Sequence, residues 1–160
     1  MNGEQEVPRD GERSVRGPEE AVGPPAWTAP PGTTHAPGVP RNAAAARDIV
    51  SRLLEEEFCG LGGEAPADVV VADALLVTSE LVTNAVRHGG GLMAFSATIT
   101  DDGLLLTVGD ASTRAPVTAE HTTTLHIGGY GWELVRRLAA RVSVTYHEDG
   151  KNIVALVALV

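Results

Sequence analysis

The sequence is poor in cysteine, with only Cys59 among 160 residues. One cysteine cannot form an internal disulfide, which excludes the class of small secreted domains that disulfides hold together. The first forty residues also contain no apolar run of signal-peptide length. We therefore expect a cytoplasmic protein.

Long apolar runs are equally scarce. The strongest is the closing segment from Ile153 to Val160. A segment of this length cannot cross a bilayer, which needs about 20 apolar residues in a helix, and it suits a buried strand far better. We expect no membrane anchor.

Positive charge is in deficit, because 12 Lys and Arg residues face 21 Asp and Glu residues and give a formal net charge of −9. An acidic domain repels phosphate backbones, so nucleic-acid binding is not expected. A single nucleotide can still bind, because a helix N-terminus and one metal ion act locally and outweigh a distant net charge.

Proline is unevenly distributed along the chain. Of the 10 prolines, only Pro66 and Pro116 lie beyond residue 40. Residues 1–41 also contain no apolar periodicity, so we predict that they form a disordered tail. Residues 42–160 are then expected to form one folded domain, because the length leaves no room for a second.

Capping and stop signals predict three helices, over residues 43–60, 66–87 and 132–140. Asn42 is a favourable N-cap for the first, and Pro66 is acceptable at the first position of the second. Glycines stop the first two helices, and Gly128-Gly-Tyr-Gly131 precedes the third. The second helix is long and contains no internal breaker.

Four short apolar runs predict strands, over residues 92–100, 104–108, 142–147 and 152–160. Asp101-Asp-Gly103 and Glu148-Asp-Gly150 separate them into two hairpins. Residues 111–127 between the hairpins are rich in Thr, Ser and His and are long for a loop in a compact domain. The order predicts an α+β fold, a two-layer sandwich in which helices cover one face of a mostly antiparallel sheet.

The second predicted helix carries a narrow polar stripe, formed by Asp73, Glu80, Asn84 and Arg87. The rest of this helix is almost entirely apolar, so we expect it to be buried and the stripe to line a ligand pocket. The alternative is a stripe that only reaches the surface, with ordinary Glu-to-Arg spacing. Spacing alone leaves both interpretations open.

Two further features could bind a nucleotide. Asp110 ends an apolar strand, although Asp in that place is most often a turn former. Gly128-Gly-Tyr-Gly131 could let backbone N–H groups approach a phosphate. The glycine segment lacks the Lys-Ser/Thr of a P-loop and follows no parallel-strand unit, so neither a P-loop nor a dinucleotide-binding fold is supported.

Other reactive residues give weaker signals. His121 and His126 have no Cys or carboxylate at ligand spacing, so we predict no zinc site. Ser79 and Ser112 are not set in a nucleophile elbow. Cys59 follows an apolar helix face and is expected in the core.

Taken in order, three segments are distinctive: Thr78-Ser-Glu-Leu-Val-Thr-Asn-Ala-Val-Arg-His-Gly89, then Val108-Gly-Asp-Ala-Ser112 with Pro116, then Gly129-Tyr-Gly131 before a helix. This order resembles the histidine-kinase-like ATPase superfamily and its Bergerat ATP-binding fold. The first string and the short length resemble the anti-sigma regulatory factors that act as serine kinases, especially the small actinobacterial regulators. The resemblance extends from about Arg47 to Val157.

The resemblance implies a cofactor set of ATP and Mg²⁺ and a division of roles. Asn84 would coordinate Mg²⁺, and Glu80 would be the general base that accepts a proton from a serine hydroxyl. Asp110 would receive the adenine amino group. Gly129 and Gly131 would belong to a lid over the phosphates.

The remaining nucleotide contacts that the resemblance implies involve Arg87, Ser112, Tyr130 and Asn152. Arg87 lies one turn from Asn84, and Asn152 stands where the family commonly has Thr. The expected partners are an anti-sigma antagonist and also a sigma factor, with a homodimer as the expected assembly.

Two other functions remain open at this stage. In the first, ATP orders residues 111–127 and so selects a protein partner without phosphoryl transfer. Trp132, where the family usually has a smaller aliphatic residue, favours this alternative. In the second, the glycines and the polar stripe are structural features of a scaffold that binds no nucleotide.

Overall fold

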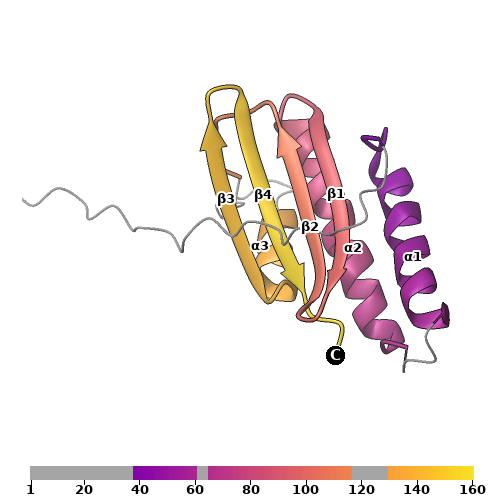
Figure 1. Cartoon of the computed structure of the whole chain (residues 1–160). Coiled ribbons are helices and arrows are strands. Elements are labelled where there is room, and N and C mark those ends of the chain that lie inside the picture. Colours follow the sequence, from indigo (N-terminus) through magenta and orange to yellow (C-terminus); the bar gives the residue numbers. More distant parts are fainter. Residues whose placement is uncertain (1–37, 61–64, 117–129) are drawn as a thin grey trace, which may run out of the picture.

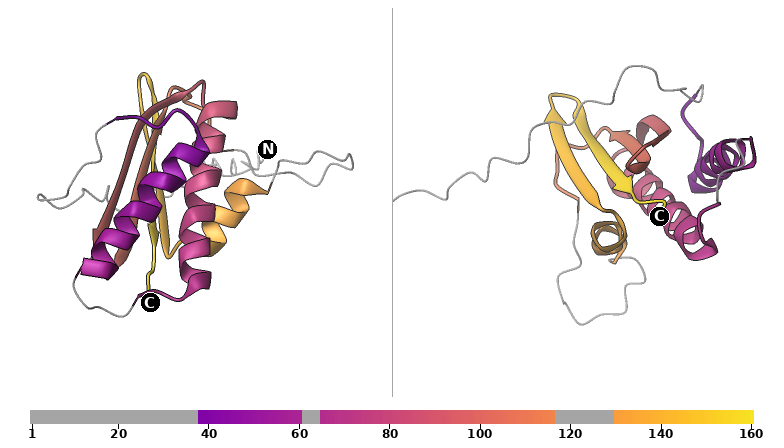
Figure 2. Two further views of the ribbon diagram at one scale, coloured as in Figure 1. Left: turned by 90° about the vertical axis from the view of Figure 1, so that its right-hand side faces the viewer. Right: turned by 60° about the horizontal axis from the view of Figure 1, so that its bottom comes forward.

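The computed structural model describes residues 38–60, 65–116 and 130–160. Its elements form two layers, with one four-stranded antiparallel sheet covered on one face by three helices (Figures 1 and 2). The predicted α+β sandwich is confirmed. The predicted tail, apart from residues 38–41, and most of the predicted loop, with His121 and His126, lie outside the described residues.

The first helix, α1, spans Ala43–Gly60 as predicted. The Asn42 side-chain oxygen accepts a hydrogen bond from the Ala45 backbone N–H at 2.9 Å, which is the N-cap interaction expected from the sequence. The side chain of Cys59 lies outside the description. Its predicted place in the core therefore stays a prediction.

The second helix, α2, spans Asp68–His88 and begins two residues later than predicted. Pro66 is not its first residue, because Ala67 has an extended conformation and its carbonyl accepts the first helical hydrogen bonds, from Val70 and Val71. Ala67 is thus the N-cap. Asp68 in the first turn supplies the negative charge that a helix N-terminus favours.

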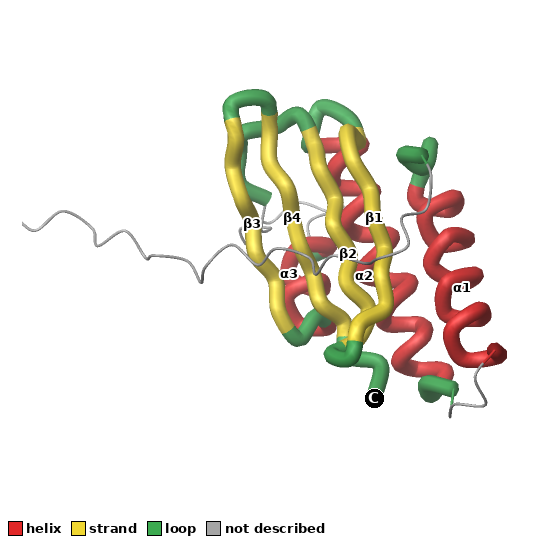
Figure 3. Tube along the Cα trace, in the orientation of Figure 1, coloured by secondary structure: helices red, strands yellow, loops and turns green. Residues whose placement is uncertain are grey.

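Four strands make up the sheet: β1 (Leu92–Thr100), β2 (Gly103–Asp110), β3 (Arg141–His147) and β4 (Gly150–Val157). Their spatial order is β1-β2-β4-β3, so the last strand, β4, lies between β2 and β3 (Figure 3). The third helix, α3, spans Gly131–Leu138 on the connection from β2 to β3. Both hairpin turns use glycine at positive φ, namely Gly103 and Gly150.

Alternate residues along each strand point towards the helices, and their side chains fill the space between the two layers. The helix-facing residues of β2 and β4 are almost completely buried: Leu104, Leu106, Val108, Ile153, Ala155 and Val157. They form one core with Leu81, Ala85 and Val135 from the helices. Asp110 and Lys151 follow at the end of the same face, in register with each other. The apolar core therefore leads directly to a buried pair of opposite charges.

The central helix α2 is long and apolar enough to cross a membrane by composition alone. In this structure it packs on the sheet and lies between α1 and α3 (Figure 2). These neighbours leave one side uncovered, and Val69, Leu76 and Val86 are exposed, Val69 by 65%. The expectation that the apolar surface of this helix is buried all round was wrong for these three residues.

Candidate functional site

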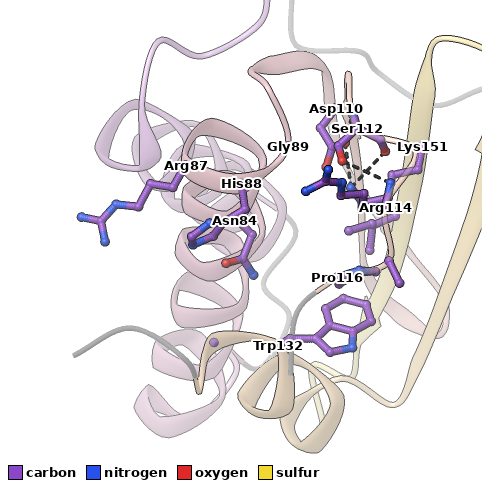
Figure 4. Close-up of a pocket in the computed structure, with 13 residues that line it drawn as sticks. Asn84, Arg87, His88, Gly89, Asp110, Ser112, Arg114, Pro116, Trp132 and Lys151 are labelled. Atoms are coloured by element: carbon purple, nitrogen blue, oxygen red, sulfur yellow. Dashed lines mark hydrogen bonds and ion pairs between the residues drawn. The ribbon is translucent and has the colours of Figure 1, made fainter. Parts of the chain in front are cut away.

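A pocket of about 410 Å³ opens where the C-terminal end of α2, the start of α3 and the adjoining ends of β2 and β4 meet (Figure 4). Five of the residues proposed from the sequence line it: Asn84, Arg87, Asp110, Ser112 and Gly131. Eight lining residues had been given no role: His88, Gly89, Arg114, Ala115, Pro116, Trp132, Lys151 and Ile153. Of these, the motif strings contained His88, Gly89 and Pro116, and Trp132 stood out as a departure from the family. No sequence signal pointed to Arg114, Ala115 or Lys151.

Asp110 and Lys151 form an ion pair at the inner wall of this pocket. Lys151 Nζ donates to Asp110 Oδ1 at 2.8 Å, and the two side chains are 5% and 3% exposed. The Ser112 backbone N–H donates to the same oxygen at 2.9 Å, which is the turn that an Asp at a strand end commonly forms. Asp110 is therefore both the turn former and a buried carboxylate in the pocket wall.

Gly89 lies against the other side of the Asp110 carboxyl group. A Cβ built on Gly89 would lie 2.5 Å from Asp110 Cγ and 2.6 Å from Oδ2. Contact this close leaves no space for a side chain at residue 89. The end of α2 and the end of β2 thus approach each other only because residue 89 is glycine.

Glu80 and Asn84, one turn apart on α2, meet the first residue of α3. A Cβ on Gly131 would overlap Glu80 Oε2 and would lie 3.7 Å from Asn84 Nδ2. The Asn84 amide lines the pocket, while the half-buried Glu80 lies beside it under Gly131. The polar stripe on α2 therefore brings the Asn84 amide and the Glu80 carboxylate together at the start of α3.

Several of the proposed residues point away from the pocket or lie outside its lining. Arg87 is exposed and its guanidinium points away from the other pocket side chains (Figure 4), and Tyr130 is 68% exposed. Asn152 follows Lys151 on β4 and so points to the opposite face of the sheet, where its Oδ1 lies close to Gly109. Asp73 is half-buried and does not line the pocket. Gly129 lies outside the described residues.

A family model described as the histidine kinase-like ATPase domain matches residues 36–158. The chain belongs to this family. It is accordingly an ATP-binding domain of the histidine kinase-like type, and the pocket contains the residues that the sequence resemblance assigned to adenine and to Mg²⁺.

Two solved structures are similar to this histidine kinase-like ATPase domain. The histidine kinase domain of the blue-light activated histidine kinase from Erythrobacter litoralis EL346 is 21% identical, with a TM-score of 0.44 over 73% of this chain and 60% of that one. A second structure of that kinase is 19% identical, with a TM-score of 0.45 over 71% and 42%. The chain thus spans less than two thirds of either protein. No curated protein sequence matches it.

The charge of the pocket suits the nucleotide of a histidine kinase-like ATPase domain. Lys151 and Asp110 offset each other's charge in its wall, and Arg114 adds a further cation to the lining, although the whole chain carries −9. Local cations raise the concentration of an anionic ligand at a cleft even when the distant charges repel it. The Arg114 side chain extends from the β2 side towards α2, across the pocket (Figure 4).

Asn84 fits the role of a Mg²⁺ ligand in such a domain. Among the described residues no group of three or more His, Cys, Asp or Glu side chains could hold a metal ion. Mg²⁺ does not need one, because it keeps several waters and binds through one or two protein oxygens together with substrate phosphates. The Asn84 amide oxygen is a suitable donor at the pocket edge.

Proposed function

We propose that this domain is an ATP- and Mg²⁺-dependent protein serine/threonine kinase of the anti-sigma factor type. Its substrate would be a serine of an anti-sigma antagonist protein, and it would also bind a sigma factor and act as a cytoplasmic homodimer. The observation that carries the proposal is the meeting of Glu80 and Asn84 at Gly131, beside a basic pocket.

The pocket supports one direction for the nucleotide. Asp110 offers a carboxylate acceptor for the adenine amino group at the inner wall, and Asn84 lies towards the start of α3, where the phosphates would be held. A cavity of about 410 Å³ is within the range of small-molecule sites. Adenine at Asp110 therefore places the γ-phosphate on the Glu80 side.

Glu80 would then act as the general base for phosphoryl transfer. The serine oxygen of the partner bonds to the γ-phosphorus, the bond to the bridging oxygen breaks, ADP leaves, and Glu80 takes the hydroxyl proton. Asn84 would hold the Mg²⁺ ion, which neutralises phosphate charge when bound. Positioning and charge neutralisation supply most of the catalysis in this reaction class.

Calorimetric titration of ATP with Mg²⁺ tests the site. Wild type should bind ATP, Asn84→Ala should lose most of that affinity, and Thr83→Ala, one residue away and outside the pocket lining, should bind as wild type does. Folded wild type that binds no ATP would reject the proposal. Equal losses in both variants would remove the assigned role from Asn84.

Incubation with labelled ATP, Mg²⁺ and candidate antagonists tests the kinase step. We expect a labelled serine with wild type and a loss of about 10²-fold or more in rate with Glu80→Gln, as is typical when a general base is removed. A Glu80→Gln variant as fast as wild type would exclude Glu80 as the base.

The second candidate is a non-catalytic module in which bound ATP sets partner binding. It is favoured by the position of Glu80, which packs against Gly131 and does not line the pocket. This function predicts ATP-dependent capture of the antagonist or sigma factor without transfer of phosphate, in wild type and in Glu80→Gln alike.

A further inference from the structure

We propose that Lys151 is a positioning residue for base recognition, which orients the Asp110 carboxylate so that the pocket selects the 6-amino group of adenine. The inference rests on the proposed ATP site and adds to it a residue to which the sequence comparison gave no role.

The two oxygens of Asp110 have different surroundings. Oδ1 accepts from Lys151 Nζ at 2.8 Å and from the Ser112 N–H at 2.9 Å. Oδ2 faces Gly89, which also lines the pocket. Two donors on one oxygen fix the rotation of the carboxyl group, and Oδ2, to which no described residue donates a hydrogen bond, is the oxygen that we assign to the base.

Lys151 is placed for this task by the sheet. It is directly opposite Asp110 in the β2 and β4 register, and it is 4% exposed. Burying an ammonium group is costly unless it is paired, and here the pair is closed by a second bond from Nζ to the Ser112 carbonyl at 3.2 Å. Lys151 thus binds both the Asp110 carboxylate and the backbone carbonyl of Ser112.

An oriented carboxylate discriminates between bases by what each offers at position 6. An ionised carboxylate only accepts hydrogen bonds, so it favours the amino group of adenine over an oxo group or a bare carbon. Removing Lys151 would leave the Ser112 N–H as the donor to Oδ1 and would hold the carboxyl group less firmly. The preference for the amino group should then fall, while contacts to ribose and phosphates remain.

The test compares ATP with purine riboside triphosphate, which lacks the 6-amino group, each with Mg²⁺ in calorimetric titrations. Wild type should prefer ATP by on the order of tenfold to a hundredfold, as expected for one hydrogen bond to a charged group. Lys151→Met should lose most of the preference, because its affinity for ATP should fall further than its affinity for the analogue. Lys151→Arg, which keeps a cation, should retain part of it.

Saturable binding of the analogue also shows that the Lys151→Met pocket is folded. If this variant does not fold, Lys151→Gln replaces it, because the amide keeps a donor without the charge, and its preference should fall below that of Lys151→Arg. The role of Lys151 would be rejected, with the ATP site left standing, by any of three results. These are a full preference for ATP in Lys151→Met or Lys151→Gln, equal weakening of both ligands in these variants, and no preference in wild type. Folded wild type that binds neither ligand would overturn the ATP site itself.

Discussion

The Glu80 carboxylate occupies the space that a side chain on Gly131 would need. This contact joins the middle of α2 to the first residue of α3, and it explains a glycine at the start of that helix without reference to backbone conformation. Any larger residue at position 131 must move Glu80, Asn84 or the helix itself.

Gly131→Ala tests whether this contact positions a base. The clashing atom is the end of a flexible side chain, so we expect Glu80 to turn away and the free energy of unfolding to change by less than about 1 kcal/mol. Serine phosphorylation should fall at least about tenfold with ATP affinity nearly unchanged. Glu133→Ala, an exposed change on the same helix, is the control. A variant with full kinase activity would contradict the prediction.

Gly89→Ala should behave differently, because its Cβ would meet the Asp110 carboxyl group, which is held by Lys151 and Ser112. Steric overlap with a group that cannot move destabilises a protein by about 1–3 kcal/mol. We therefore expect both a lower Tm and weaker ATP binding. Thermal unfolding and calorimetry measure the two effects. Val86→Ala, an exposed change one turn earlier, should leave ATP binding unchanged.

Trp132 should report nucleotide binding by fluorescence. Its indole is 9% exposed and lines the pocket beside Pro116, so a bound nucleotide changes its surroundings (Figure 4). In a Trp27→Phe variant, which leaves Trp132 as the single tryptophan, we expect a saturable change in emission on adding ATP with Mg²⁺. The same titration in Asn84→Ala should show a weaker response, and an unchanged spectrum in wild type would contradict the pocket assignment.

Asn42→Ala should destabilise the domain by about 1 kcal/mol, because the variant loses the hydrogen bond to the Ala45 N–H at the start of α1. Chemical denaturation monitored by circular dichroism measures the difference. Arg41→Ala removes an exposed neighbour without a capping role and should be close to neutral. Equal stability of Asn42→Ala and wild type would show that water replaces the cap.

Local signals were sufficient for most of the fold. The cap at Asn42, the glycines that end the first two helices and the turn at residues 101–103 act over a few neighbouring residues, so they can be read directly. The strand order could not be obtained in this way. Placing β4 between β2 and β3 depends on contacts between distant segments, which leave no short-range pattern.

The site residues that could be predicted are those that lie in short, recognisable sequence strings. Asn84 and Asp110 lie in recognisable strings and both line the pocket. Lys151 could not be predicted, because its ion pair with Asp110 depends on the register of β2 and β4, and the resemblance indicated Asn152 instead. Successive strand residues point to opposite faces, so an offset of one residue moves a side chain from the pocket to the other side of the sheet.

The central place of β4 gives the domain a particular order of assembly during translation. Residues 150–157 leave the ribosome after every other strand, yet they must enter between β2 and β3 and bring Lys151 and Ile153 to the pocket. In a nascent chain that ends before residue 150, β2 and β3 each lack the strand that pairs with them, and apolar residues of β2 are exposed. The pocket is complete only when β4 has joined the sheet, so we expect bound ATP to stabilise chains whose synthesis has passed β4.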